Sequence, residues 1–564
     1  MLAMTGATID GDSDVDAVET AIRRATDALF RAQRKDGSWV DHLSSSAVAT
    51  APALLSLHLA DPVRHAKAIA EGCAWLRATQ HADGSWGDAV VDSGTLNATA
   101  ITVPILAILE RERSVDAISR GLAFIELQGG EEALRDLERC SIFPLCLQFM
   151  AMAGLYDADR VHRMPSELIL VPQRFRRWFA VSAPCVYSWG MMQSRQSRSS
   201  RRVQWLQRIA EPKAIRFLEQ TQGSNGGYEE SAILTACVYI GLRKADVGHA
   251  VADRCLEYLV ETRRADGSWP IDRDLELSVT TYILRGLHAA GKIRDPRLAR
   301  TADWIASGQH DRPWEATGAP AGGWAWARPS GWPDADDTAC ATLALERLGR
   351  PEHRGAVVRG CDWLLAMQNS DGSWGGFLRN GRLSMDQPCA ALTSHAVLAL
   401  REAGGFGPRD KCIRNALRYF SRVQRPDGAV PTLWFRHFTC GTAWVLNAYA
   451  ALGLPYDPVA VRCRAWLLRH QNSDGGWGSL RGTASTVEET AWALTALAAG
   501  GVPSSHTRLE AAARWLVEHQ NAEGTWEPSV ICHYYSHLSY SSDHIANGFA
   551  LEALGRFHRG RGET

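Results

Sequence analysis

A short phrase, QxxDGxW, recurs along the chain and constrains its fold more than any other feature. Copies begin at Gln33, Gln80, Gln368, Gln471 and, with Glu in place of Asp, Gln520, and degenerate copies begin at Gln222, Arg263 and Gln424. Successive copies start 47, 142, 41, 105, 56, 47 and 49 residues apart, and the two long intervals are close to three and two short ones. The chain is therefore built from a repeated unit of about fifty residues.

Each unit predicts a helix, a tight turn and a second helix. The Asp-Gly or Asn-Gly pair favours a turn, and flanking segments such as VRCRAWLLRHQ carry apolar residues at helical spacing. Because neither helix can bury its apolar face alone, such units stack into a solenoid or close into an α/α barrel. We therefore predict an all-α fold, in which the repeated Gln and Trp tie neighbouring helices together.

Composition restricts the partners and the compartment. The chain has 564 residues, of which 46% are hydrophobic and 22% charged, with a formal net charge of -1. It can bury a large core but offers no overall charge for binding nucleic acid. Its 13 cysteines form no CxxC pair, and its acidic N-terminus lacks the features of a secretory signal. These features predict a cytoplasmic protein without a nucleic-acid partner, and they do not indicate an oligomeric state.

Residues 165–205 depart from the repeat. An apolar stretch from Trp178 to Met192 lies between two groups of arginines, namely Arg174, Arg176 and Arg177 before it and Arg195, Arg198, Arg201 and Arg202 after it. This pattern is typical of a segment that contacts one face of a membrane without crossing it, here the inner face. A buried helix with solvated arginines at both ends has the same pattern, so both interpretations stay open.

Three carboxyl groups, Asp334, Asp336 and Asp337, lie within four residues of one another. Pro333 and the helical spacing of TACATLALERLG place them at a helix N-terminus, where Asp is a good cap. Carboxyl groups so close repel one another when ionised, so at least one should keep its proton at neutral pH and serve as a general acid. A simple N-cap, or the acid of an inverting glycosidase, is an alternative interpretation.

Tryptophans directly precede this cluster, at Trp324, Trp326 and Trp332. Indole faces stabilise positive charge by about 0.5 to 2 kcal/mol each when desolvated. The same residues could instead serve only in packing.

The acidic cluster and the repeat together resemble a known family. The segment DADDTA resembles the DxDDTA motif of class II terpene cyclases, and the QxxDGxW copies resemble the QW repeats of squalene-hopene cyclases. The resemblance extends in order along almost the whole chain, through MPSELILVPQRFRRW, LTSHAVLAL and ALEALGRF. It implies two α/α barrels in the βγ arrangement, with residues 31–274 inserted into a domain made of residues 1–30 and 275–564.

The resemblance also implies roles for individual residues. Asp336 would protonate a terminal alkene or epoxide, with Asp334 and Asp337 as its partners, and His395 of LTSH would hydrogen-bond the acid. Pocket aromatics would include Trp324, Trp326, Phe377 and Phe149. No redox cofactor is expected, because no GxGxxG after a strand and no P-loop is present.

Substrate choice is where the chain departs from hopene cyclases. Their GRWGVNYxYGT segment is replaced by WFRHFTCGT, which retains Trp434 as a pocket aromatic, and the aromatic FPGDFYLGY segment by the polar HYYSHLSYSSDH. ELSVTTY around Ser278 also lacks the family's pocket Trp. We therefore favour a shorter prenyl diphosphate, farnesyl diphosphate giving a drimane-type bicyclic diphosphate or geranylgeranyl diphosphate, over squalene or another neutral polyprenoid.

A diphosphate substrate would require Mg²⁺ and a phosphate partner. Glu229 and Glu230 are the candidate metal ligands, because Mg²⁺ prefers carboxylate oxygen, and Arg436 is the candidate phosphate partner. Solvated glutamates and a salt bridge are the structural alternatives for these residues. Two other functional classes are weighed, a prenyltransferase subunit with an Asp, Cys and His zinc site and a non-catalytic toroid.

Overall fold

The protein is almost entirely helical. The computed structural model describes residues 11–562, apart from residues 42, 197–200, 329–330, 382, 384–385 and 535–537. Its only strands in the described residues form two small antiparallel hairpins, β1 (Trp86–Gly87) with β2 (Gly94–Thr95) and β3 (Cys532–Tyr534) with β4 (Leu538–Tyr540). The prediction of an all-α fold is confirmed.

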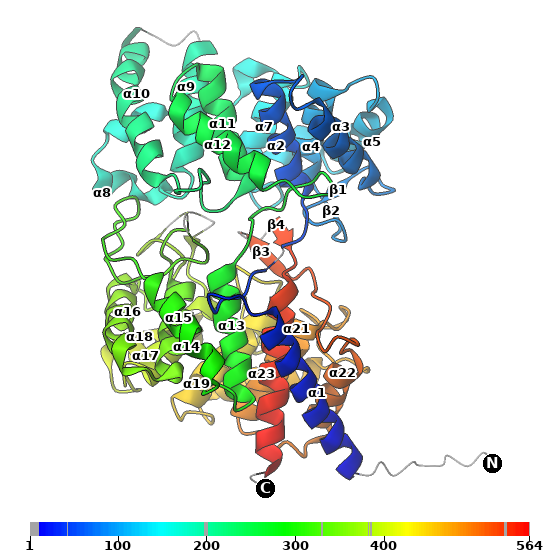
Figure 1. Ribbon diagram of the computed structural model, residues 1–564, viewed down its shortest axis with the longest axis vertical. Helices are drawn as coiled ribbons and strands as arrows, with labels where there is room; N and C mark the ends of the chain where they lie inside the picture. Colours follow the sequence, from blue (N-terminus) through cyan, green and yellow to red (C-terminus); the bar gives the residue numbers. More distant parts are fainter. Residues whose placement is uncertain are drawn as a thin grey trace, which may run out of the picture.

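The upper body in Figure 1 is formed by residues between the first helix and α13. Its elements are α2 (Ala47–Ala60), α3 (Ala66–Ala78), α4 (Leu96–Leu109), α5 (Val115–Leu127), α6 (Gly130–Arg135), α7 (Phe143–Met152), η1 (Ala158–Arg160), η2 (Ser166–Leu170), α8 (Gln173–Arg176), η3 (Arg177–Phe179), α9 (Ala183–Gln196), α10 (Arg201–Thr221), α11 (Ala232–Ala245) and α12 (His249–Glu261).

The lower body combines the first helix with the second half of the chain (Figure 1). Its elements are α1 (Gly11–Ala32), α13 (Glu276–Ala289), η4 (Pro296–Leu298), α14 (Ala299–Ser307), α15 (Ala335–Leu348), η5 (Pro351–His353), α16 (Arg354–Met367), α17 (Ala390–Glu402), α18 (Lys411–Val423), α19 (Thr439–Ala451), α20 (Pro458–His470), α21 (Val487–Ala499), α22 (Thr507–Glu518) and α23 (Asp543–Gly562).

The lower body is a closed barrel of inner helices surrounded by outer ones. Helices α13, α15, α17, α19, α21 and α23 each pack against the next, and α23 packs against α13 to close the ring. Inner helix α21 is buried continuously from Val487 to Leu497, whereas outer helix α18 buries only Ile413, Ala416, Tyr419 and Phe420. A helix that is buried on every side belongs to the inner ring. An amphipathic helix, with one apolar face, packs that face against the ring from outside.

The helices can be placed along the predicted division of the chain. Residues 31–274 contain all helices from α2 to α12, and residues 1–30 return to pack with the C-terminal half, where α1 contacts α22 and α23. Helix α1 itself ends at Ala32. The boundaries at 30/31 and 274/275 stay a prediction.

The repeated Gln and Trp form hydrogen bonds between helices. In the copy at Gln471, the indole Nε1 of Trp477 donates to the carbonyl of Leu467 at 2.8 Å. The amide of Gln471 donates to Gly475 at 2.8 Å and to Arg508 of the next outer helix at 2.7 Å. Equivalent bonds to a carbonyl ten residues earlier are donated by the indoles of Trp39, Trp86, Trp269, Trp374 and Trp526.

One copy of the repeat is not recognisable in the sequence, because extra residues separate its Gln from its Trp. Gln309 donates to Gly322 at 2.8 Å and Ala356 at 2.9 Å, and Trp324 donates from Nε1 to Ile305 at 2.7 Å. Gln309 lies 46 residues after Arg263 and 59 before Gln368, which accounts for the long interval of 105 residues. Trp324 is therefore the tryptophan of a repeat.

The apolar stretch of residues 165–205 contributes to the core. Helix α9 buries most of its residues from Ala183 to Met192, as the buried-helix interpretation expects. Beside it, Phe175 and Trp205 are exposed by 58% and 61%. None of the helices among the described residues is long and apolar enough to cross a membrane.

We predict that Trp477→Phe lowers the melting temperature. The phenyl ring fills much of the indole's space, but the buried carbonyl of Leu467 loses its donor, which costs about 1 to 3 kcal/mol. Trp205→Phe is the matched control, because Trp205 is exposed on α10 and should leave the melting temperature unchanged. The melting temperatures are measured by differential scanning calorimetry. The same melting temperature for both variants and the parent protein would contradict the structural role of the repeat.

Candidate active site

The acidic cluster begins inner helix α15. Asp334 has an extended backbone and is the N-cap, because its side chain accepts a hydrogen bond from the amide of Asp337 at 2.9 Å. Asp336 and Asp337 occupy the first turn, where the helix dipole favours negative charge. The predicted cap is thus present, but it uses only one of the three carboxyl groups.

Asp336 is held by two neighbouring inner helices. His395 of α17 is hydrogen bonded through Nδ1 to Asp336 Oδ1, and Tyr282 of α13 donates from its hydroxyl to Oδ2 at 3.0 Å. The structure therefore places His395 beside the acid, as the resemblance implies. Tyr282 was missed, although it lies one helical turn after Ser278, whose hydroxyl donates to Asp337 at 2.7 Å.

A buried stack supports the imidazole of His395. The ring of Trp444 meets His395 edge-on, with centroids 4.2 Å apart, and the guanidinium of Arg285 lies 4.6 Å from the centroid of Trp444. Arg285 forms a bidentate ion pair with Glu552, with two contacts of 3.1 Å. Both charged residues are buried, so the stack leaves His395 little freedom to leave Asp336.

The environment separates the acidities of the three carboxyl groups. Burial, and then the charge of Asp337, raise the pKa of Asp334 well above its usual range. Burial and the charge of Asp336 raise the pKa of Asp337 to about 7. Burial also opposes ionisation of Asp336, but the charge and hydrogen bond of His395, with the bond from Tyr282, outweigh it and lower its pKa. Asp336 is thus the strongest acid of the three, and the groups titrate together.

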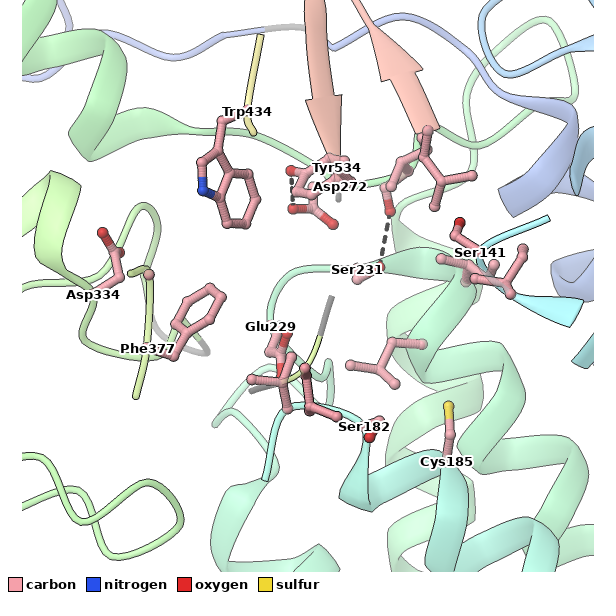
Figure 2. A pocket seen from close by; sticks show the side chains of 18 of the residues that line it. Ser141, Ser182, Cys185, Glu229, Ser231, Asp272, Asp334, Phe377, Trp434 and Tyr534 are labelled. Atoms are coloured by element: carbon pink, nitrogen blue, oxygen red, sulfur yellow. Dashed lines mark hydrogen bonds between the residues drawn. The ribbon is translucent and has the colours of Figure 1, made fainter. Parts of the chain in front are cut away.

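A cavity of about 790 Å³ connects this cluster to the upper body. Its walls include Asp334, Asp336 and Asp337 at one end and residues of the segments around α7 and α9 at the other. Figure 2 shows Asp334 and Phe377 on one side and Ser141, Ser182 and Cys185 on the other, with Glu229 and Asp272 between them.

One wall of the cavity is aromatic. Trp326 and Phe377 have ring centroids 5.7 Å apart, Phe377 and Trp434 6.2 Å, and Trp434 and Tyr534 6.4 Å. Tyr540 stacks on Tyr534 at 4.8 Å. The two tyrosines belong to the segment HYYSHLSYSSDH, which the sequence analysis treated as polar, so aromatic lining is retained there. These faces can stabilise a cation along the cavity.

Two carboxyl groups face the middle of the cavity. Glu229 adopts a left-handed backbone, with φ of 55°, and its buried Oε1 has no hydrogen-bond partner among the described residues. Burial, and then the charge of Asp272, raise the pKa of Glu229 well above its usual range. Burial also raises the pKa of Asp272 to about 7, against hydrogen bonds from Tyr534 and Ser231.

The prediction that Glu230 is a metal ligand is not supported by its position. Its carboxylate does not line the cavity but accepts a bond from Asn225 at 2.8 Å and pairs with Arg273 at 3.3 Å. Glu229 and Glu230 are both buried, so the solvated alternative is also wrong. Asp272, which the sequence analysis did not name, is the carboxyl group that accompanies Glu229.

Four residues that were predicted to line the pocket or bind phosphate lie outside the cavity lining, namely Trp324, Trp332, Phe149 and Arg436. Trp324 belongs to the repeat, Trp332 packs beside Trp314 with centroids 5.8 Å apart, and Phe149 packs on Trp189 at 5.0 Å. Arg436 donates to Asp92 at 2.5 Å and so links the two bodies, which is the predicted structural alternative. Trp326, Phe377 and Trp434 are the predicted aromatics that line the cavity.

Comparisons with known proteins agree with this geometry. The family model of the squalene-hopene cyclase N-terminal domain matches residues 22–193, and that of the C-terminal domain matches residues 279–559. The squalene-hopene cyclase of Alicyclobacillus acidocaldarius is 26% identical, over 88% of this chain and 90% of its own. A drimenyl diphosphate synthase of Streptantibioticus cattleyicolor is 29% identical over 48% of this chain and 51% of its own.

Among solved structures, ent-copalyl diphosphate synthase from Streptomyces platensis has a similar fold. The TM-score is 0.63 at 20% identity, covering 97% of this chain and all of that chain. At this level of sequence identity, the similarity indicates a shared fold and nothing about the substrate.

We predict that Glu552→Gln strongly destabilises the protein at neutral pH. Arg285 would stay buried without its partner, which typically costs about 3 to 5 kcal/mol. Neighbouring arginines lower the pKa of Glu552 to about 2 against the cost of its burial, so its contribution exists above the unfolded value of about 4.5 and is lost as pH falls towards about 2. The difference in melting temperature between parent and variant should therefore shrink on acidification.

Glu510→Gln is the matched control for this prediction. Glu510 pairs with Arg561, but the two side chains are 31% and 22% exposed, so its loss should matter little. Equal effects of the two substitutions at pH 7 would contradict the role of the buried pair.

Proposed function

Because the chain belongs to the squalene-hopene cyclase family and is a class II terpene cyclase, we propose that it cyclises a linear prenyl diphosphate. Farnesyl diphosphate, giving a drimane-type bicyclic diphosphate, is the favoured substrate, and geranylgeranyl diphosphate is the longer variant. The reaction starts by protonation and leaves the diphosphate attached. A non-catalytic toroid would have no use for an acid held by His395 and Tyr282.

Asp336 is the proton donor in this proposal. Its O–H bond breaks as the terminal alkene takes the proton, and the alkene's electron pair forms the new C–H bond and leaves a tertiary cation. His395 and Tyr282 stabilise the carboxylate that forms, because each is hydrogen bonded to one of its oxygens. An alkene is a very poor base, so an acid as strong as Asp336 suits the task. Because its lowered pKa leaves it ionised at neutral pH, Asp336 must take a proton from solvent through the cavity before each turnover.

The aromatic wall then guides the cation. The positive charge moves away from Asp336 as each new ring closes, past Trp326, Phe377 and Trp434. Loss of a proton or capture of water ends the sequence. Asp334 and Asp337 are buried beside Asp336, and a substrate that fills the cavity would exclude water while the cation exists.

The pair Glu229 and Asp272 is the observation that favours a diphosphate. A pure hydrocarbon gains nothing from two buried carboxyl groups, whose burial is costly. Mg²⁺ is commonly held by one or two carboxylates together with substrate phosphates, and the unpartnered Oε1 of Glu229 fits such a ligand. When bound, Mg²⁺ would neutralise the diphosphate, while Glu229 and Asp272 would fix that end of the substrate away from Asp336.

A neutral polyprenoid such as squalene is the second candidate, on one specific observation. Among the described residues that line the cavity, the only arginine or lysine is Arg163, and Arg163 is paired with Glu167. A diphosphate would therefore depend almost wholly on the metal for its positive partner.

We also propose peripheral membrane contact through residues 165–205. The exposed side chains of Phe175 on α8 and Trp205 on α10 support it, because aromatic residues enter the bilayer interface. Such contact would suit a substrate with a long apolar chain.

The product formed from each candidate substrate tests the proposed function. Purified protein is incubated with farnesyl diphosphate, geranylgeranyl diphosphate or squalene, with Mg²⁺ or with EDTA, and products are identified by mass spectrometry before and after phosphatase treatment. We expect a bicyclic alcohol that is released only by phosphatase and is absent with EDTA. A metal-independent product from squalene would instead select the neutral substrate. Asp336→Asn should abolish either product, while Asp303→Asn should not, because the side chain of Asp303 is exposed on the surface of α14.

We predict that Glu229→Gln raises the Mg²⁺ concentration needed for half-maximal activity by about tenfold or more. The amide keeps the shape of the side chain but removes the charge that would bind the metal. Glu276→Gln is the matched control, because burial also raises the pKa of Glu276 to about 7 although this residue does not line the cavity. An unchanged Mg²⁺ dependence in Glu229→Gln would exclude this site.

A further inference from the structure

A cysteine adjoins the proposed proton donor. Cys340 lies one turn after Asp336 on α15, and its Sγ is 4.0 Å from Asp336 Oδ1 and 3.9 Å from His395 Nδ1. The potential ligand atoms of Asp336, Cys340 and His395 all lie within 4.8 Å of one another. A thiol, an imidazole and a carboxyl group therefore converge on one point at the acid end of the cavity.

We propose that Asp336, Cys340 and His395 form an inhibitory binding site for a thiophilic divalent cation such as Zn²⁺. Zinc sites with an open position use three protein ligands of these types, with a fourth place for water or substrate. Thiolate and imidazole select such ions over Mg²⁺, which prefers oxygen ligands. The site is thus chemically distinct from the carboxyl pair of Glu229 and Asp272.

The separations need only small changes for zinc. With Zn–S near 2.3 Å and Zn–N and Zn–O near 2.0 to 2.1 Å, tetrahedral ligand atoms lie about 3.4 to 3.6 Å apart. The sulfur is already 3.9 to 4.0 Å from the other two ligand atoms. The larger change falls to the Asp336 carboxylate, which must move away from Nδ1 of the fixed His395 to admit the ion.

The position of the three side chains explains how an ion would enter. Asp336 lines the cavity and its side chain is 19% exposed, whereas that of His395 is 3% exposed. Cys340 is also buried. An ion arriving through the cavity would meet the carboxylate first, and its open coordination position would face the cavity.

Zinc at this point would remove the proton donor. The ion takes the carboxylate of Asp336 and the thiolate of Cys340, so any proton on either group is released to solvent. It also binds the lone pair of His395 Nδ1, so a proton on that nitrogen is released as well and His395 no longer supports Asp336. The inhibition rests on the proposed function, but the binding site does not.

The same residue types are those of a zinc-dependent prenyltransferase subunit, which the sequence analysis considered. Stoichiometric zinc in the purified protein would therefore not by itself indicate that activity. In this chain the ion would occupy the acid motif and oppose catalysis.

Cobalt absorption tests binding without any substrate. Chelator-treated parent protein, Cys340→Ser and Cys361→Ser are titrated with Co²⁺ and then with Zn²⁺, and circular dichroism checks that each variant is folded. We expect tetrahedral cobalt bands and a thiolate charge-transfer band in the parent and in Cys361→Ser, lost on adding Zn²⁺ and absent in Cys340→Ser. Cys361 is the control because it is also buried but lies on outer helix α16.

Absence of these bands from the parent, or their persistence in Cys340→Ser, would overturn the proposed site. If Cys340→Ser fails to fold, Cys340→Ala replaces it, and Asp336→Asn supplies an independent loss of a ligand that should also weaken the bands.

Inhibition is measured at fixed Mg²⁺, relative to the uninhibited rate of each variant. The Zn²⁺ concentration for half inhibition should rise by about tenfold or more in Cys340→Ser and stay unchanged in Cys361→Ser. Equal sensitivity of all three proteins would place the inhibitory ion elsewhere and overturn the proposal. If no substrate is turned over, the cobalt titration still decides the metal site, so failure of the proposed function is distinguishable from failure of this inference.

Discussion

The hydrogen bond between His395 and Asp336 is the interaction on which the rest of this structure depends. Three adjacent carboxyl groups are costly to bury, and among them only Asp336 has partners strong enough to lower its pKa against the cost of burial. That partner comes from α17 and the second, Tyr282, from α13, so both inner helices must flank α15. Closure of the barrel fixes these neighbours, and the stack of Trp444, Arg285 and Glu552 fixes the imidazole.

The cavity couples this acid to a second, different polar region. The two are connected by an aromatic wall from Trp326 to Tyr534, and they belong to different bodies of the molecule. Two contacts across the junction fix the positions of the two regions relative to each other. Arg436 pairs with Asp92, and Tyr534 is hydrogen bonded to Asp272. In the proposed reaction, the junction would therefore recognise the length and headgroup of the substrate, whereas the chemistry would start in one barrel.

Burial gives the acid end and the middle of the cavity different chemical properties. At Glu229 and Asp272, burial raises both pKa values, at Asp272 against two hydrogen bonds, and leaves oxygen atoms suited to a hard cation. At Asp336, the imidazole and the nearby thiol of Cys340 make a site suited to a softer one. A cation could therefore help or oppose the reaction according to which of the two positions it occupies.

The sequence by itself determined the helical repeat, the helix cap at Asp334, the acid motif and its pairing with His395. The repeat and the cap follow from local spacing, and the acid motif from adjacent residues. The pairing of Asp336 with His395, 59 residues further along the chain, came only from the family resemblance. The sequence could not reveal Tyr282, Asp272, Tyr534 or Tyr540 as cavity residues, nor exclude Trp324, Phe149 and Glu230. Which face of an inner helix meets the cavity is decided by ring closure and by the contact between the two bodies. Such contacts join residues hundreds of positions apart, and no local pattern records them.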